Sequence, residues 1–343
     1  MSEIEPTPSA ARARTQPLVT VCVPTVGRLE YLEQALASLT KQTYQNREVL
    51  ILDNASPPDA REVLGRFAAR HPDVRVLRVD ERVAMFANFN RGVEAARGEY
   101  VVFCHDDDVF LPTFLERYVE LLELYPSAGF ASGNYDLIGR QGELLRHQRI
   151  IKRTELWSGH RFIDELCKTG RSPFSTPGIV FRRSVLERFG FDEQVTIYWG
   201  DFTILMRMAE ICDVAVLAET QYSWRKHGEN ESAGWLMSDG IPLRTEVLSA
   251  YLAEFRARHP EYATFAAQLE RRILRTHRNG LVWGWLSAPN NQEADVCLKL
   301  LSASFPTTRL TGALTVLQRL GLSSERRRAL LPIFRRVGEA FKA

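Results

Sequence analysis

The stretch YVVFCHDDD, residues 100–108, runs from a short apolar segment directly into three consecutive aspartates. Carboxylates placed side by side at a strand end repel one another, and a chain tolerates them more readily where a cation neutralises their charge. Hard oxygen ligands of this kind suit Mg²⁺ or Mn²⁺ carrying a diphosphate. Taken alone, the triplet has an alternative interpretation, a solvated acidic turn.

Upstream of this stretch, apolar runs with the length of buried strands alternate with segments of helical spacing. We expect strands within residues 17–29, 48–52 and 74–79, and helices within residues 31–40 and 84–96. Together with the strand at 100–103, this alternation predicts an α/β fold whose mostly parallel sheet is flanked by helices.

The polar residues that follow these strands should meet at one edge of the sheet. Thr25, Asp53 and residues 106–108 each come at the end of an expected strand. In parallel sheets, ligands bind outside the carboxyl ends of the strands, so a single crevice collects these side chains.

With these residues in place, the chain resembles the family 2 glycosyltransferases, which have the GT-A (Rossmann-like) fold. The resemblance covers roughly residues 17 to 235. It rests on six segments in the family's order: residues 21–25 (VCVPT), 51–56 (ILDNAS), 90–92 (NRG), 96–108 (ARGEYVVFCHDDD), 189–202 (FGFDE through WGDF) and 224–232 (WRKHGENES).

The resemblance implies a nucleotide-sugar donor, with UDP or dTDP favoured, and Mn²⁺ or Mg²⁺ as cofactor. Asp53 would accept a hydrogen bond from the base, although an Asx turn or helix cap is the structural alternative. The donor-binding residues that it implies are Pro24, Thr25, Asp53, Asn90, Asp106 and Asp107. The metal ligands that it implies are Asp106, Asp108 and His227.

The register of the aspartate run leaves two alignments open. An Asp-x-Asp-Asp pattern puts His105 in place of the first aspartate, whereas a strict Asp-x-Asp pattern uses Asp106 and Asp108. In either alignment we expect His105 to act as a spacer or hydrogen-bond donor rather than as a metal ligand. For His227, a surface loop histidine is the alternative.

Asp201 is the general base that the resemblance implies. It would take the proton of the acceptor hydroxyl as that oxygen attacks the anomeric carbon opposite the diphosphate, which inverts the configuration. A plain helix N-cap is the alternative role for this carboxylate. Gly200 stands where the family usually has Glu. Further acceptor or diphosphate contacts are expected from Trp199, Trp224 and Arg225.

Composition excludes or disfavours several other classes of protein. Over 343 residues the formal net charge is only +2, which disfavours a nucleic-acid binder driven by bulk charge. The five cysteines lack paired or metal-ligand spacing, and no run of about 18 apolar residues would span a bilayer, so a cytoplasmic protein is expected. Residues 1–16 read as a disordered lead rather than a secretory signal.

The expected domain organisation is a glycosyltransferase domain at 17–238 and an α-helical extension at 239–343. The extension shows helical segments at 243–258, 262–285, 292–304 and 308–320. Residues 325–342 form a basic amphipathic segment suited either to peripheral contact with the inner face of the membrane or to docking within the protein, and the extension could equally support a homodimer.

The sequence therefore predicts an inverting, metal-assisted glycosyltransferase. It would move a sugar to a hydroxyl of a saccharide or lipid-linked acceptor in polysaccharide or glycoconjugate biosynthesis. Two alternatives stay open, a non-catalytic nucleotide-sugar-binding relative and a sugar nucleotidyltransferase.

Overall fold

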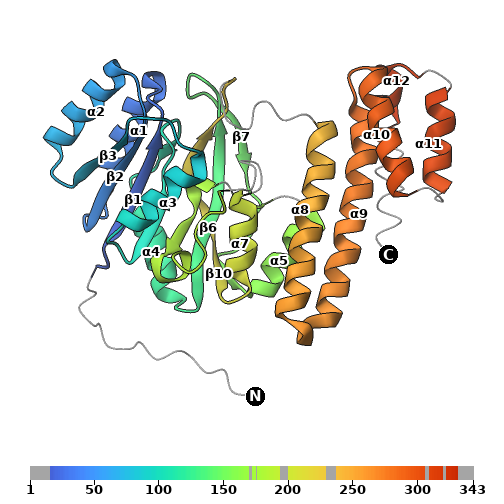
Figure 1. Ribbon diagram of the computed structural model, residues 1–343. Coiled ribbons are helices and arrows are strands. Elements are labelled where there is room, and N and C mark those ends of the chain that lie inside the picture. The colour runs from blue at the N-terminus through green and yellow to red at the C-terminus, as the bar shows by residue number, and fades with distance from the viewer. Residues whose placement is uncertain are drawn as a thin grey trace. The chain divides into compact units, whose positions relative to one another are not determined.

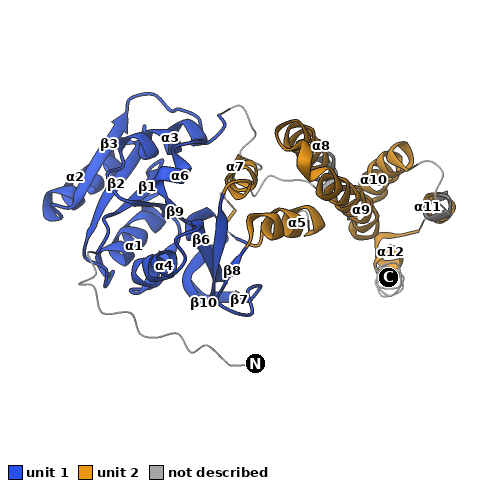
Figure 2. Ribbon diagram, turned by 90° about the horizontal axis from the view of Figure 1, so that it is seen from below, with its two compact units in different colours: residues 1–157, 174–193, 212–226 blue, residues 158–173, 194–211, 227–343 orange. Residues whose placement is uncertain are grey.

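The computed structural model describes residues 16–169, 172–174, 176–193, 200–228, 237–305, 309–319 and 322–330. These residues form two compact units that alternate along the chain (Figure 2). Unit 1 is drawn from residues 1–157, 174–193 and 212–226, and unit 2 from 158–173, 194–211 and 227–343. The predicted division into a glycosyltransferase domain at 17–238 and an extension at 239–343 has a single boundary, whereas the two units interleave. That division stays a prediction.

The first half of unit 1 alternates strands and helices along a parallel sheet (Figure 1). Its strands occur in the spatial order β3-β2-β1-β4, and every neighbouring pair among them is parallel. The elements are β1 (Val19–Thr25), α1 (Leu29–Thr40), β2 (Arg47–Asn54), α2 (Pro58–Arg70), β3 (Val74–Val79), α3 (Met85–Ala95) and β4 (Tyr100–Phe103).

The second half of unit 1 extends the same sheet with mixed pairing. The order continues from β4 through β9, β6 and β10 to β5; β6 and β10 are parallel, while β9 is antiparallel to both β4 and β6. The elements are β5 (Val109–Phe110), α4 (Phe114–Leu124), β6 (Ala128–Ile138), β7 (Leu144–Gln148), β8 (Glu155–Trp157), η1 (Thr176–Gly178), β9 (Val180–Arg182), α6 (Arg183–Leu186) and β10 (Asp213–Arg225).

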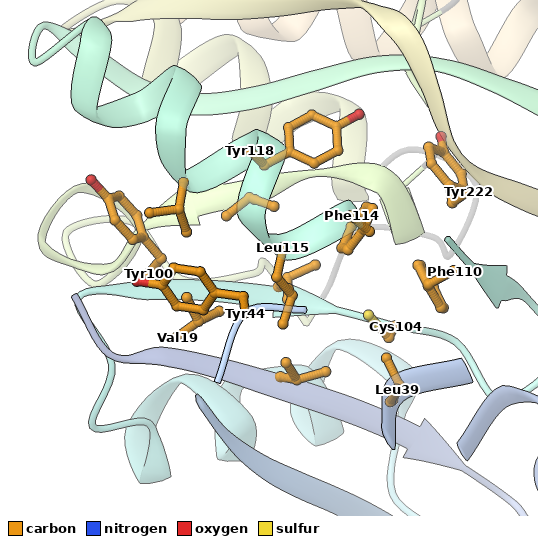
Figure 3. Packing of buried hydrophobic residues seen from close by; sticks show 14 of the residues in the cluster. Val19, Leu39, Tyr44, Tyr100, Cys104, Phe110, Phe114, Leu115, Tyr118 and Tyr222 are labelled. Atoms are coloured by element: carbon orange, nitrogen blue, oxygen red, sulfur yellow. The ribbon is translucent and has the colours of Figure 1, made fainter. Parts of the chain in front are cut away.

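The apolar runs of the sequence form the main core of unit 1. Side chains of β1, β2 and β4 pack with α1 and α4, and Figure 3 shows Tyr118 and Phe114 of α4 above the strand that carries Val19. Every residue of β4 is buried, as expected for a central strand covered on both faces. The predicted α/β class is confirmed, with the parallel arrangement confined to part of the sheet.

Gly98, just before β4, lies where a side chain would collide with backbone. A Cβ added there would lie 2.5 Å from Thr20 N and 2.7 Å from Leu18 O. We expect Gly98→Ala to destabilise the protein by about 1–3 kcal/mol, measured by urea unfolding. The control is Gly65→Ala in α2, where a Cβ would meet nothing within 4 Å, and which should stabilise by about 0.5–1 kcal/mol. Equal shifts for the two variants would contradict the prediction.

Unit 2 is built from helices. Asp164 of α5 accepts hydrogen bonds from Gln268 and Arg272 of α9, and Trp285 is fully buried in a small apolar cluster of α9, α10 and α11. The elements are α5 (Gly159–Thr169), α7 (Gly200–Ala209), α8 (Met237–Arg258), η2 (Pro260–Tyr262), α9 (Ala263–Ser287), α10 (Asn291–Ser304), α11 (Arg309–Arg319) and α12 (Ser324–Ala329).

The helices predicted for the extension are confirmed as α8 to α11; α8 begins at Met237, earlier than the predicted start at 243, and the other ends agree within two residues. Of the predicted basic segment 325–342, α12 accounts for the first residues, and 331–343 lie outside the described residues, as does most of the predicted lead at 1–16. Among the helices that the structure describes, none combines the length and hydropathy needed to cross a bilayer.

Candidate active site at the carboxyl edge of the sheet

The predicted site residues of the first strands do meet at one edge of the sheet. Thr25, the last residue of β1, pairs in register with Asp53 of β2. Its hydroxyl donates a hydrogen bond of 2.5 Å to Oδ2 of Asp106, which follows β4. Thr25, Asp53 and Asp106 therefore lie at the same edge of the sheet, as strand topology predicted.

Asp106 is held by two protein donors. Besides Thr25, Arg28 donates from Nη2 to Oδ1 of Asp106 at 2.6 Å, and the same nitrogen lies 3.2 Å from Oδ2 of Asp107. Burial raises the pKa of the Asp106 carboxyl, whereas the Arg28 guanidinium opposes that shift. Arg28, which the sequence analysis did not select, thus supplies a cation to the aspartate run.

His105, Asp107 and Asp108 form a cluster suited to a metal ion. One potential ligand atom from each lies within 4.8 Å of the others. Nε2 of His105 and Oδ2 of Asp108 are buried and have no hydrogen-bond partner. Burial lowers the pKa of His105, which favours the neutral imidazole that binds metals, and burial followed by repulsion from Asp107 raises the pKa of Asp108. A divalent cation would satisfy both orphaned atoms, and a set of two carboxylates with one imidazole suits Mn²⁺, whereas Mg²⁺ prefers oxygen ligands.

This cluster differs from the ligand set predicted from the sequence. Asp108 belongs to both sets, but the structure brings His105 and Asp107 beside it, while Asp106 is engaged by Thr25 and Arg28. From the sequence, His105 was expected to be a spacer or hydrogen-bond donor rather than a metal ligand. The metal roles of Asp106 and His227 stay predictions.

Arg225, at the end of β10, forms hydrogen bonds that connect the aspartate run to other parts of unit 1. Its backbone N–H donates to Oδ1 of Asp108 at 2.8 Å, and its Nε donates to the carbonyl oxygen of Asp107 at 2.8 Å. The remaining guanidinium nitrogens donate to Gln34 and to the carbonyl of Gly139. Arg225 is only 1% exposed, so its predicted contact with acceptor or diphosphate stays a prediction, whereas its positioning role is evident.

Asp53 is oriented by its neighbours rather than free to rotate. Its Oδ1 accepts the backbone N–H of Ser56 at 2.9 Å, the Asx-type contact considered as the structural alternative. Its Oδ2 accepts from Arg78 Nη1 at 2.9 Å. Ala55 adopts φ 57° in this turn, a strained value for a residue with a side chain. Arg78 was not among the residues predicted from the sequence, and its 2.9 Å contact with Asp53 is what identifies it.

Asn90 uses its amide to hold a distant loop. Nδ2 donates to the carbonyl of Phe191 and to Glu193, both at 2.9 Å, and Oδ1 accepts the N–H of Phe191 at 2.8 Å. The ring of Phe191 in turn packs on Phe86, Phe89 and Phe103. The donor-binding role predicted for Asn90 is therefore not what its hydrogen bonds indicate, and it stays a prediction.

The remaining residues predicted for the site lie in different parts of the chain. Asp201 is half-buried in the first turn of α7 and accepts the N–H of Phe202 at 2.8 Å. His227 is 7% exposed, and both it and Asp201 belong to unit 2. Trp224 is half-buried against the core of unit 1. Trp199 lies outside the described residues.

The family model for glycosyl transferase family 2 matches residues 20–190 of this chain, a range that spans β1 to α6 and contains the aspartate run. The chain belongs to the family 2 glycosyltransferases. Among curated relatives of this family 2 chain, an uncharacterized glycosyltransferase of Nostoc, alr2836, is 26% identical over 219 residues, covering 62% of this chain and 66% of that protein.

A second relative is the putative teichuronic acid biosynthesis glycosyltransferase TuaG of Bacillus subtilis. It is 27% identical over 127 residues, covering 37% of this chain and 50% of TuaG. The chain thus matches less than two thirds of the length of these curated relatives.

Solved structures with the same fold cover most of the chain. TarS 1–349 of S. aureus in complex with UDP-GlcNAc aligns with a TM-score of 0.62 at 17% identity, over 91% of this chain and 87% of TarS 1–349. The mannosyltransferase PcManGT of Pyrobaculum calidifontis, in complex with GDP-Man and Mn²⁺, aligns with a TM-score of 0.55 at 20% identity, over 94% and 86%. The predicted GT-A fold is confirmed.

Proposed function

We propose that the chain transfers a sugar from a nucleotide-diphosphate sugar to an acceptor hydroxyl with inversion at the anomeric carbon. The observation that carries this proposal is the pair of buried, unpartnered ligand atoms, His105 Nε2 and Asp108 Oδ2, at the carboxyl edge of a family 2 sheet. The names of two structural neighbours support the donor class, since those proteins were solved with UDP-GlcNAc and with GDP-Man and Mn²⁺.

In this proposal His105, Asp107 and Asp108 hold the divalent cation, which supplies positive charge to the departing diphosphate when bound. Arg28 keeps Asp106 in place and adds a second cation beside it. Arg225 fixes the backbone of the aspartate run through Asp107 and the side chain of Asp108.

In the same proposal, other residues bind the base of the donor nucleotide and activate the acceptor hydroxyl. Asp53, held by Ser56 and Arg78, keeps a fixed carboxylate next to Thr25 and accepts a base N–H. Asp201 takes the proton of the acceptor hydroxyl. Contacts from Pro24, Asn90, Trp199, Trp224 and His227 belong to the same proposal.

The acceptor class is a saccharide or a lipid-linked saccharide used in polysaccharide or glycoconjugate biosynthesis. The name of TuaG, which refers to teichuronic acid biosynthesis, supports a role in building an envelope polymer. A cytoplasmic location, peripheral membrane contact through the basic C-terminal segment and a homodimer are further parts of the proposal.

Calorimetric titration with UDP, dTDP, GDP and CDP, each with and without Mn²⁺, tests the donor site. We expect one diphosphate, UDP or dTDP, to bind at least about tenfold more tightly with Mn²⁺, because a cation held by His105, Asp107 and Asp108 would offset the negative charge of the diphosphate. Folded protein that binds none of the four would overturn the proposal. Tight donor binding without transfer would instead indicate the non-catalytic relative, which the presence of Gly200 in place of the usual Glu keeps as a second candidate.

A further inference from the structure

Residues 144–153, here called the basic edge segment, lie on the rim of unit 1 and take no part in the proposed chemistry. The segment begins with β7, whose strand partner within the described residues is β6 alone, so β7 is an edge strand beside the sheet (Figure 2). Edge strands are exposed to other molecules, and proteins usually protect them with charge or with an unfavourable shape.

The segment exposes large apolar side chains close together in the chain. Leu144 is 53% exposed, Leu145 is 50% exposed and Ile150 is 47% exposed. Elsewhere in unit 1, the exposed leucines Leu111 and Leu124 occur singly, which is ordinary for a protein surface. Apolar side chains gathered on one edge instead indicate an interaction surface.

The first four residues of β7 are all exposed, so both faces of the strand are open at its two leucines, and a β-bulge lies at the same place. Ile138 of β6 pairs with Leu144, but the neighbouring Leu137 pairs with Arg146, so Leu145 is an additional residue in β7. In a regular strand successive side chains point to opposite faces, and a bulge changes that direction locally. The strand therefore begins with an exposed apolar pair at an irregular point of its pairing with β6.

The same segment is rich in cations. It contains Arg146, Arg149, Lys152 and Arg153, together with His147, and it has no Asp or Glu. Asp136 of β6 faces it and accepts from Arg149 at 2.9 Å, with His147 Nδ1 at 2.8 Å. Edge protection alone would account for the charges, but it would not place half-exposed leucines beside them.

We propose that the basic edge segment docks unit 1 on an anionic lipid surface. Basic side chains next to exposed apolar ones match a bilayer interface, where cations contact anionic headgroups and apolar side chains enter the boundary of the acyl region. Because the whole chain has a net charge of only +2, attraction to such a surface depends on local concentrations of cations, and this segment is one of them.

The turn that leads into the segment is connected to the candidate active site. Arg225, whose N–H binds Asp108, also donates from Nη1 to the carbonyls of Gly139 and Arg140 in the β6–β7 turn. Docking through the segment would thus bring the carboxyl edge to a membrane that carries a lipid-linked acceptor. That consequence rests on the proposed function, whereas lipid binding itself does not.

Sedimentation of the full chain with vesicles of phosphatidylcholine and phosphatidylglycerol in equal parts tests the proposal. We expect the triple variant Arg146→Glu, Lys152→Glu, Arg153→Glu to bind at least about a hundredfold more weakly, because each basic residue near such a surface contributes about fivefold to partitioning. The control with the same charge change reverses Arg61, Arg66 and Arg70, exposed residues of α2, and should bind like the wild type.

A second variant, Leu144→Ser with Leu145→Ser, keeps every charge and should lose about tenfold in vesicle binding. Calorimetric titration of the same variants with nucleotide should match the wild type, which separates this proposal from the proposed function. The proposal is overturned if the wild type does not sediment with anionic vesicles, if both segment variants bind as it does, or if the wild type binds heparin but no vesicles, which would assign the segment to a soluble polyanion.

Discussion

Asp201→Asn is expected to lower the transfer rate by about 10²–10⁴-fold while leaving donor binding intact. The amide cannot accept the hydroxyl proton, and general-base catalysis commonly contributes a factor of that size. Steady-state transfer and calorimetric titration of the nucleotide diphosphate, performed on the same preparation, give the two readouts.

Asp59→Asn is the matched control, because Asp59 occupies the equivalent place in another helix. It is the second residue of α2, as Asp201 is of α7, and each carboxylate accepts the N–H of the next residue, at 2.9 Å and 2.8 Å. If Asp201 serves only the helix start, both variants should lose about 0.3–1 kcal/mol of stability and neither should lose activity. That result would exclude Asp201 as the base.

Asp108→Asn is expected to weaken Mn²⁺-dependent nucleotide binding by at least about a hundredfold. Removing residues that merely support a metal ligand already costs 10–100-fold, and loss of a ligand charge should cost no less. The asparagine oxygen can still accept the N–H of Arg225, so the fold should persist, which thermal unfolding checks. Titration with Mn²⁺ and nucleotide is the measurement.

His105→Gln distinguishes the two candidate ligand sets. If His105, Asp107 and Asp108 hold the ion, this variant should lose Mn²⁺ affinity in parallel with Asp108→Asn. If the ligands are Asp106, Asp108 and His227, Mn²⁺ affinity should be retained in His105→Gln and lost in Asp106→Asn. Unchanged affinity in Asp108→Asn would exclude Asp108 under either set.

The parallel part of the fold was predictable because each strand is a continuous apolar run and each helix repeats its apolar positions. β1 to β4 and α8 to α11 appear close to the expected ranges for that reason. The antiparallel placement of β9 between β4 and β6 was not predictable, since it depends on pairings between segments roughly fifty to eighty residues apart.

Some residues of the candidate site could be predicted from the sequence, and others could not. Thr25, Asp53 and the aspartate run were found because strand ends can be read from sequence, and topology places them at one edge. Arg28 and Arg78 were not found, because an arginine after a glycine or within a strand is ordinary, and only the folded distances of 2.6 Å to Asp106 and 2.9 Å to Asp53 mark them. The His105 contribution depends on its burial, which sequence patterns do not supply.

The interleaving of the two units has a consequence for the order in which the chain matures on the ribosome. β10 lies inside the sheet, between β6 and β5, yet residues 158–173 and 194–211, synthesised before it, belong to unit 2. The nascent chain therefore carries an incomplete sheet, with β6 lacking its parallel partner β10, until residue 225 has emerged from the exit tunnel. During that interval α9 has not been synthesised, so Asp164 of α5 lacks its hydrogen bonds from Gln268 and Arg272. Segments of both units are therefore exposed to chaperones and proteases at the same time.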